Sequence, residues 1–328
     1  MPGGRGQTHF VCAGSLRRLS HRVPPFKSNA ALAVSLLFAV FLWGGNNAGT
    51  KWLVTSWPPI WTGSTRFLCA GLLLLAGLRW TNWFGERSEL TPDLQRRLWW
   101  RGGLSLAAYI VSFNYALRYT SVSHVALYLG ASPVWALLWE GRPAKHWRSA
   151  QRYAAAALAL AGVWVLFRPA LQSGTSNLTG EALGLAASVL WTNYGRQCRA
   201  LGANLGGAEI TAHTMWRAGV WLLPLGVVEA GVTGVPWSWP LAAVQGYCIV
   251  AGGVVAFGIW TNALRHWPTS QVLLFNNLIP LSSMAWAHLC LGESITPTFW
   301  LAMMLVVAGV VLGQTKFGKR KIGTNEPE

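Results

Sequence analysis

Long stretches without any charged residue are the feature that most restricts the fold of this chain. Residues 28–50, 119–139, 230–264, 266–292 and 294–315 contain no Asp, Glu, Lys or Arg. A helix crosses the hydrocarbon core of a bilayer with about 20 mostly apolar residues, so each stretch is long enough to span a membrane. Only 11% of all residues are charged, whereas soluble domains average about 25%. The sequence therefore predicts an all-α integral membrane protein.

Five further apolar segments are short or carry one Arg, and we interpret them as spans as well. The ten expected spans cover 30–50, 58–78, 102–118, 121–140, 152–168, 180–198, 209–229, 240–262, 268–290 and 297–315. An even number of spans places both termini on the same side of the membrane.

The formal net charge of +16 is compatible with a nucleic-acid partner or with a topology signal. With the N-terminus inside, 21 of the 26 Lys and Arg residues fall in cytoplasmic segments, and only Lys51, Arg118 and Arg168 fall on the opposite side. Cytoplasmic loops of membrane proteins carry this excess. We expect a multi-pass membrane protein with cytoplasmic N- and C-termini, and no nucleic-acid partner.

A fixed offset of 147 residues relates the two halves of the chain. Between 116–163 and 263–310, 13 of 48 positions are identical, among them Ala161-Gly162-Val163, which recurs as Ala308-Gly309-Val310. A unit of five spans is inserted upside down when it is repeated, because five is odd. Such inverted repeats are typical of secondary transporters, whose substrate site lies near the membrane midplane.

We therefore expect ten transmembrane helices arranged as two inverted five-helix repeats. The expected parts are a basic cytoplasmic tail (1–29), a first repeat with spans 1–5 (30–168), a second repeat with spans 6–10 (169–315) and a cytoplasmic C-terminal tail (316–328).

Several motifs occur in an order that resembles a known family. They are Trp43-Gly44-Gly45-Asn46-Asn47-Ala48-Gly49-Thr50-Lys51, then Pro59 with Arg66-Phe67, then Ala116-Leu117-Arg118-Tyr119-Thr120-Ser121 with Pro133, and finally Pro280, Leu291-Gly292-Glu293 and Ala308-Gly309-Val310. Together they resemble the EamA-type family of the drug/metabolite transporter (DMT) superfamily over about residues 30–315. The resemblance implies a ten-helix carrier of the cell inner membrane, built from two five-helix repeats, that commonly exports small metabolites. One turn departs from it, since Lys145-His146 stands where Gly292-Glu293 stands in the second half and Glu140 lies earlier.

Polar and aromatic residues inside apolar spans are candidates for the substrate cavity, because polar groups in a bilayer usually face the bundle interior. The candidates are Asn46, Asn47, Tyr109, Asn114, Trp191, Asn193, Tyr194, Asn262, Asn276 and Asn277. Helix packing is the competing role for each of them. We favour Asn276 and Asn277, because Pro280 follows them and a break in a span points to a binding site.

Three ionisable residues within the spans have more than one possible role. His124 and His213 are possible proton relays, because imidazole titrates near neutral pH; a hydrogen-bonded structural role is the alternative. Arg66 is either structural or offers its guanidinium to a substrate anion. No Asp or Glu lies at the middle of a predicted span, so we expect facilitated diffusion or coupling through His instead of carboxylate-driven antiport.

The sequence favours a membrane transporter of small organic metabolites, of which amino acids or related amphipathic compounds are the class we expect. It would work as an exporter by alternating access, as a monomer or homodimer in contact with membrane lipid. No metal or cofactor is expected, because the five Cys residues are widely spaced and form no ligand motif. The alternatives are an integral-membrane enzyme, for which no nucleophile–base pair or paired acids are evident, and a non-transporting structural membrane subunit.

Overall fold

The computed structural model is helical throughout the regular elements that it describes, so the predicted all-α class is confirmed. It describes residues 29–81, 87–132, 135, 139, 147–173, 175–202, 204–266, 275 and 278–314.

Ten helical stretches follow one another along the described residues. The elements are α1 (Asn29–Ser56), α2 (Pro59–Trp80), α3 (Pro92–Arg97), η1 (Leu98–Gly103), α4 (Leu104–Tyr119), α5 (Val122–Gly130), α7 (Trp147–Ser173), α8 (Thr175–Leu201), α9 (Gly207–Thr233), α10 (Trp239–Tyr247), η2 (Cys248–Val255), α11 (Ala256–His266), α13 (Ile279–Leu291) and α14 (Pro297–Gln314). The π-helical segments η1 and η2 continue directly into α4 and α11, so α3–α4 and α10–α11 each form one stretch.

Several helices extend beyond the predicted spans; α7 and α8 each begin five residues earlier than predicted. Capping groups are evident at the ends of two other helices. The Ser121 hydroxyl accepts the backbone N–H of His124 and begins α5, as expected for an N-cap residue. Gly292 adopts a left-handed conformation with φ of 68° and ends α13, a conformation that glycine adopts without steric cost.

Three described segments are long and apolar enough by themselves to cross a membrane: Ala30–Ser56, Pro59–Trp80 and Trp239–Trp260. The number of clear apolar spans is therefore smaller than the ten that we predicted. Helix α9 shows one reason, because its 27 residues include Glu209, Arg217 and Glu229. Such groups lower the mean hydropathy of a helix although the bundle can bury them.

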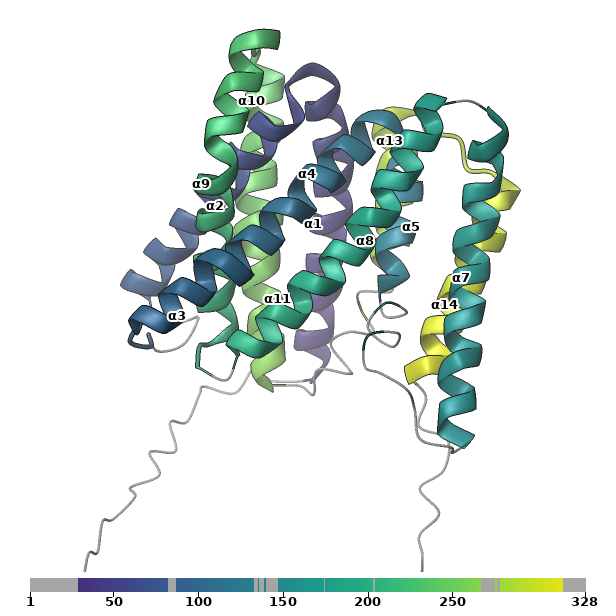
Figure 1. The fold of residues 1–328 in the computed structure, drawn as a ribbon, viewed down its shortest axis with the longest axis horizontal. Helices are drawn as coiled ribbons and strands as arrows, with labels where there is room; N and C mark the ends of the chain where they lie inside the picture. Colours follow the sequence, from purple (N-terminus) through teal and green to yellow (C-terminus); the bar gives the residue numbers. More distant parts are fainter. Residues whose placement is uncertain are drawn as a thin grey trace, which may run out of the picture.

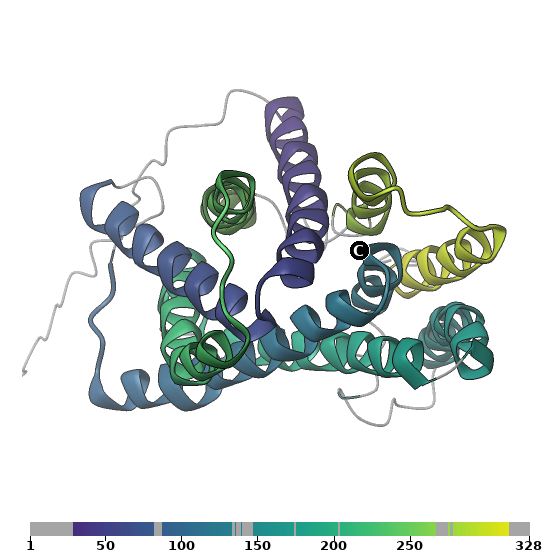
Figure 2. The same ribbon diagram turned by 90° about the horizontal axis from the view of Figure 1, so that it is seen from above.

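Helices α7 and α14 pack side by side at one edge of the molecule (Figures 1 and 2). A Cβ atom at Gly162 would lie 2.6 Å from the Ala302 carbonyl oxygen, and one at Gly309 would lie 2.6 Å from the Ala155 carbonyl oxygen. The two contacts run in opposite directions along the two helices, so the pair is antiparallel. Both Gly162 and Gly309, and both Ala155 and Ala302, are separated by the 147-residue offset of the sequence repeat.

Helices α2 and α9 form a second antiparallel pair, toward the opposite edge (Figure 1). A Cβ at Gly71 would approach the backbone of Trp216, and one at Gly219 would approach the backbone of Leu68. Small residues at such crossings allow two backbones to come close together. One helix from each half of the chain therefore contributes to the helix pair at each edge.

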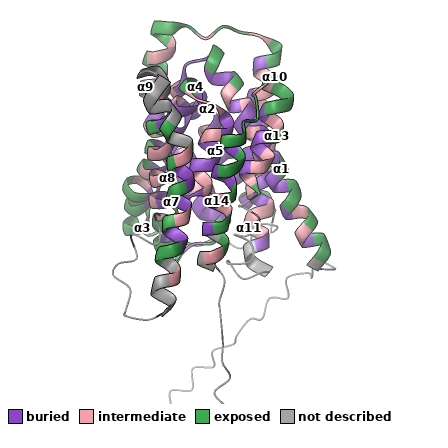
Figure 3. Cartoon of the chain, turned by 90° about the vertical axis from the view of Figure 1, so that its right-hand side faces the viewer, coloured by how far each residue is buried: buried purple, intermediate pink, exposed green. Residues whose placement is uncertain are grey.

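Exposed and buried residues are divided between the outside and the inside of the bundle (Figure 3). The outer faces carry exposed apolar side chains such as Val34, Phe38 and Leu72. In a bilayer these faces contact lipid, and the buried polar groups between the helices are the places to look for a functional site.

Candidate functional site

An aromatic group lies between α4 and α8, and three predicted cavity residues form it. The rings of Tyr109 and Trp191 are 4.9 Å apart, and those of Trp191 and Tyr194 are 5.5 Å apart. The Tyr194 hydroxyl lies 2.9 Å from Thr214 on α9. Asn193 on α8 donates to the Ser105 hydroxyl on α4 at 3.2 Å. The sequence candidates of spans 3 and 6 therefore lie together.

The two asparagines of α1 contact the second half of the chain. Asn47 donates to the hydroxyl of Ser283 on α13 at 2.9 Å and is buried. The side chain of Asn46 packs against Gly252 in η2, where a Cβ would meet it at 2.5 Å. In this conformation both residues connect α1 to helices of the second half. Among the described residues, neither forms a hydrogen bond with the aromatic group.

Asn114 has one satisfied and one unsatisfied polar atom. Its amide nitrogen donates to the Pro59 carbonyl at the start of α2 at 2.8 Å. Its Oδ1 atom is buried without a hydrogen-bond partner among the described residues. An unpaired buried acceptor is costly, so Asn114 retains capacity for a ligand donor.

The remaining asparagine candidates belong to the predicted spans 240–262 and 268–290. Asn262 lies on α11 and is half-buried. Asn276 and Asn277 lie outside the described residues, so their proposed role stays a prediction.

Arg66 on α2 is 4% exposed and donates a hydrogen bond to the Thr50 hydroxyl on α1. The Arg66 guanidinium carbon also lies 4.7 Å from the centre of the Phe67 ring. No Asp or Glu of the described residues forms an ion pair with it. A guanidinium in a membrane is costly unless it is paired, and Arg66 carries its positive charge without an acidic side chain to balance it among the described residues.

His213 on α9 is bound to Arg217, one turn later. Its Nδ1 atom accepts hydrogen bonds from Arg217 Nη1 at 3.1 Å and from the Trp216 indole at 3.3 Å. A proton at Nδ1 would break both bonds and bring a second positive charge against the guanidinium. This geometry favours a neutral, structural imidazole.

His124 on α5 has a different environment, because it faces a buried carboxylate. Its Nδ1 atom lies 2.7 Å from Glu181 Oε1 on α8. The hydroxyls of Thr120 and Tyr128 also donate to Glu181. Glu181 is 2% exposed, so these three side chains take the place of water around its carboxylate.

Sequence reasoning missed Glu181 as a site residue because the acid lies at the end of the predicted span 180–198, not at its middle. Helix α8 begins at Thr175, which places Glu181 in the second turn. A signal was present in the sequence: the acid follows the uncharged segment 169–180, where a carboxylate within the helix costs free energy unless it is paired.

Two other carboxylates bind the N-terminal ends of helices. Glu229 accepts the backbone N–H groups of Ile60 and Trp61 at the start of α2. Glu293, from the Gly-Glu motif, accepts those of Val122 and Ser123 at the start of α5. A carboxylate is favourable there, because the helix dipole and the unpaired N–H groups attract negative charge.

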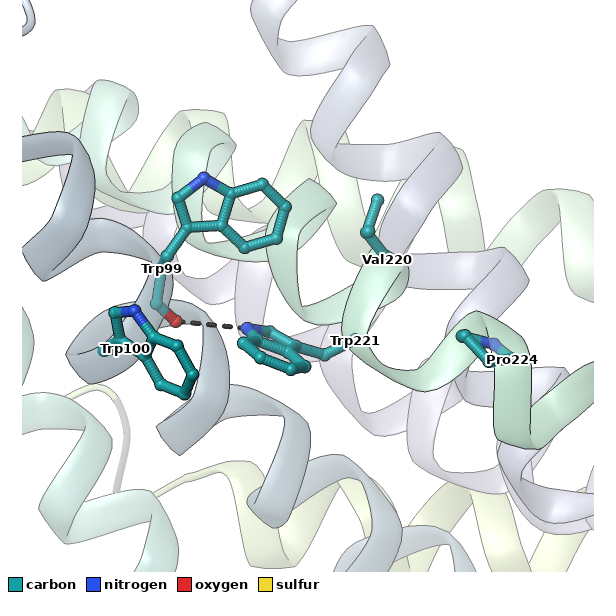
Figure 4. Close-up of a pocket in the computed structure, with 5 residues that line it drawn as sticks. All are labelled: Trp99, Trp100, Val220, Trp221 and Pro224. Atoms are coloured by element: carbon teal, nitrogen blue, oxygen red, sulfur yellow. Dashed lines mark hydrogen bonds between the residues drawn. The ribbon is translucent and has the colours of Figure 1, made fainter.

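A shallow pocket of about 370 Å³ lies between η1 and α9, and its Trp99 ring lies 5.3 Å from the Arg217 guanidinium carbon (Figure 4). Its lining residues are Trp99, Trp100, Val220, Trp221 and Pro224. The Trp221 indole donates to the Trp99 carbonyl at 3.2 Å across it. None of the predicted cavity residues lines this pocket, and its apolar lining suits a surface that contacts lipid.

The sequence matches the model of the EamA-like transporter family at residues 31–168 and again at residues 178–313. The chain is also similar to curated proteins over most of their length. It is 24% identical over 300 residues to an uncharacterized transporter of Archaeoglobus fulgidus, covering 88% of this chain and 98% of the relative. It is 28% identical over 283 residues to the uncharacterized inner membrane transporter YedA of Escherichia coli K12, covering 84% and 88% of the two chains.

A solved crystal structure has a similar fold, with a TM-score of 0.55 at 18% identity. The similarity covers 87% of this chain and 98% of the other chain. It supports the fold and says nothing further about activity.

Proposed function

The chain belongs to the EamA-like transporter family, and from this premise we propose that it exports small organic metabolites by alternating access. It is a membrane-embedded transporter, because the family and the named relatives are transporters and the bundle exposes apolar helices. The substrate class we propose is amino acids or related amphipathic carboxylates.

The observation that carries the alternating-access proposal is the reciprocal packing of α7 and α14. Gly162 contacts Ala302, and Gly309 contacts Ala155, with the same 147-residue offset between equivalent residues. An exchange of equivalent residues across an antiparallel pair is what a two-fold axis in the membrane plane produces. This supports two inverted repeats, 30–168 and 169–315, whose exchange of conformations would open the substrate site to each side in turn.

The substrate class rests on Arg66 and on the aromatic group, whose Tyr109 packs in the same buried cluster as Phe67, the residue that follows Arg66. A guanidinium without an acidic partner can bind a carboxylate through two parallel hydrogen bonds. Tyr109, Trp191 and Tyr194 provide apolar ring surface with polar edges nearby. An amphipathic compound with one carboxylate fits both features, and the unpaired Oδ1 of Asn114 is an acceptor for an ammonium group.

The proposed location is the cell inner membrane with both termini in the cytoplasm. The first residue of α1 and the last residue of α14 lie at the same end of the bundle (Figure 1). The excess of Lys and Arg in the segments assigned to that end supports its cytoplasmic placement.

Counterflow in proteoliposomes tests the proposal. Vesicles loaded with one unlabelled L-amino acid are diluted into a trace of the same labelled compound, for each member of a panel of amino acids and their amines. We expect transient accumulation for at least one carboxylate. A folded protein that gives no counterflow with any compound would contradict a transport function, and turnover of a compound in detergent would indicate an enzyme instead.

A further inference from the structure

The contact between α5 and α8 contains an imidazole and a buried carboxylate, and we infer that His124 and Glu181 form a proton-binding site. A proton taken up by His124 turns its hydrogen bond to Glu181 into an ion pair and fastens α5 to α8. The site senses the pH at the end of the bundle where α4 meets α5. Its effect on transport rests on the proposed function, but proton binding itself does not.

The two members of the pair differ in exposure to solvent: His124 is partly exposed, whereas Glu181, which carries the negative charge, is buried. The His124 side chain is 30% exposed, whereas the Glu181 side chain is 3% exposed. The exposed imidazole can exchange a proton with water, and its Nδ1 lies 2.7 Å from the carboxylate. Glu181 has no direct route to solvent of comparable size, so the proton reaches the pair through His124.

The carboxylate is arranged as an anion. Thr120, Tyr128 and His124 all direct hydrogen-bond donors at Glu181. Hydrogen bonding of this kind favours the charged form of an acid. With His124 neutral, the pair carries one buried negative charge; with His124 protonated, the pair is neutral overall. Proton uptake therefore removes a buried net charge and strengthens the hydrogen bond.

The pair connects the two halves of the chain. Glu181 lies near the start of α8, in the second half, whereas its three donors lie on α5 and on the turn that precedes it. The contact between α5 and α8 continues along α8, where the Ser188 hydroxyl donates a hydrogen bond to the Tyr128 carbonyl. A change in the strength of the hydrogen bond between His124 and Glu181 therefore alters the packing of the first half of the chain against the second.

The charged groups around the pair come from each neighbouring element. From α1, the Lys51 ammonium donates to the Thr120 carbonyl at 2.9 Å. Glu293, after α13, holds the N-terminal end of α5, and His288 on α13 lies 2.9 Å from the Glu293 carbonyl. The other neighbouring groups are exposed and lie on α4 and α7: Arg118, Tyr119 and Arg168. Helix α9 and segment η1 meet α8 near its other end, around Leu201.

Two histidines lie in this region: His288 contacts a backbone carbonyl, whereas His124 contacts a carboxylate. Lys51 and Glu293 carry opposite charges at neutral pH and bind different atoms of the same turn. Histidine is the residue whose charge changes between about pH 5 and pH 8. His124 is the histidine in direct contact with a carboxylate among the described residues.

Hydrogen exchange measured by mass spectrometry tests the inference without a substrate. The full chain in nanodiscs of phosphatidylethanolamine and phosphatidylglycerol is compared at about pH 5.5 and about pH 8, with exchange corrected for its intrinsic pH dependence. We expect amides of Val122–Gly130 and of the first turns of α8 to exchange about threefold or more slowly at the lower pH, because the ion pair opposes local opening.

Two variants remove the response in different ways. Glu181→Gln removes the anion, and His124→Asn keeps an amide nitrogen near the position of Nδ1 but cannot gain a proton. We expect both to show no pH-dependent slowing. His213→Asn is the matched control, since it alters a histidine in α9 that faces Arg217, and it should retain the wild-type response in α5 and α8.

A wild-type response in both variants would overturn the proton site, as would a wild-type protein without any pH-dependent slowing. If Glu181→Gln does not fold, His124→Asn alone tests the inference. The His124 side chain is partly exposed, so its replacement disturbs the packing less. Loss of counterflow with an intact exchange response would contradict the transport proposal alone. Counterflow with a flat exchange response would contradict the proton site alone.

Discussion

At the scale of single residues, the buried charges have distinct partners that the sequence did not reveal. Arg217 is bound to His213 and packs against the rings of Trp216 and Trp99. Arg66 has a hydroxyl partner, Thr50, and no acidic one among the described residues. The two arginines look equivalent in the sequence, since each interrupts an apolar span, but their partners in the folded chain differ.

Arg66→Leu separates a substrate role from a structural role. We expect apparent affinity for a transported carboxylate to fall about 10- to 100-fold, because charge-assisted hydrogen bonds contribute roughly 1.5–3 kcal/mol. Affinity for the corresponding amine, which lacks the carboxylate, should change little. Counterflow of the two compounds measures this, and equal losses for both would assign Arg66 to the structure alone.

Glu293 illustrates a residue whose motif was evident but whose partner was not. Its position after Leu291-Gly292 was noted from the sequence, whereas its contact with Val122 and Ser123 joins residues about 170 positions apart. Only the folded chain brings these groups together. Similarly, the sequence identified His124 but not Glu181, because the acid stood at the end of the predicted span 180–198, whereas α8 begins at Thr175 and places it in the second turn.

Glu293→Gln should destabilise the protein by about 1 kcal/mol, since it removes the charge that interacts with the N-terminal end of α5. Thermal unfolding in detergent, followed by circular dichroism, measures the change. Glu89→Gln is the control, because Glu89 is exposed. Equal melting temperatures for the two variants would show that the capping contact contributes nothing measurable.

At the scale of elements, the existence of the helices was predictable and their contacts were not. Uncharged stretches marked five of the ten predicted spans, because the bilayer requires about 20 apolar residues in each. They could not indicate which helices pair, since helices that are apolar on every side give no periodic signal. Gly162 and Gly309 lie at the contact between α7 and α14. In the sequence, the only sign that they are related is their 147-residue separation in the repeat.

Gly162→Leu and Gly309→Leu should destabilise the bundle to a similar extent. Each added side chain meets a carbonyl oxygen at 2.6 Å, and forcing α7 and α14 apart costs about 1–3 kcal/mol or more. The folded fraction after heating, measured by size-exclusion chromatography, reports the effect.

Gly195→Ala provides the control for these variants, because nothing lies within 4 Å of a Cβ at that position of α8. It should be neutral or slightly stabilising, since alanine favours a helix. A large loss in only one of the two leucine variants would contradict equivalent roles for Gly162 and Gly309.

At the scale of the whole molecule, the distribution of basic residues makes a prediction about orientation. Green fluorescent protein fused after Gln314 should fluoresce, because that end is proposed to be cytoplasmic. Alkaline phosphatase fused after Ser56 or after Ser173 should be active, because both positions end helices on the proposed outer side. The reverse pattern of reporter activity would contradict the proposed orientation.

The pairing of α7 with α14 also bears on how such a chain could arise. The α7 face that carries Ala155 and Gly162 meets an equivalent face of α14, with each alanine opposite the other glycine. The face is therefore complementary to an upside-down copy of itself. A half-length ancestor inserted into the membrane in both orientations would already have formed this contact between two identical molecules. Fusion of two gene copies would then have preserved an existing dimer interface within one polypeptide.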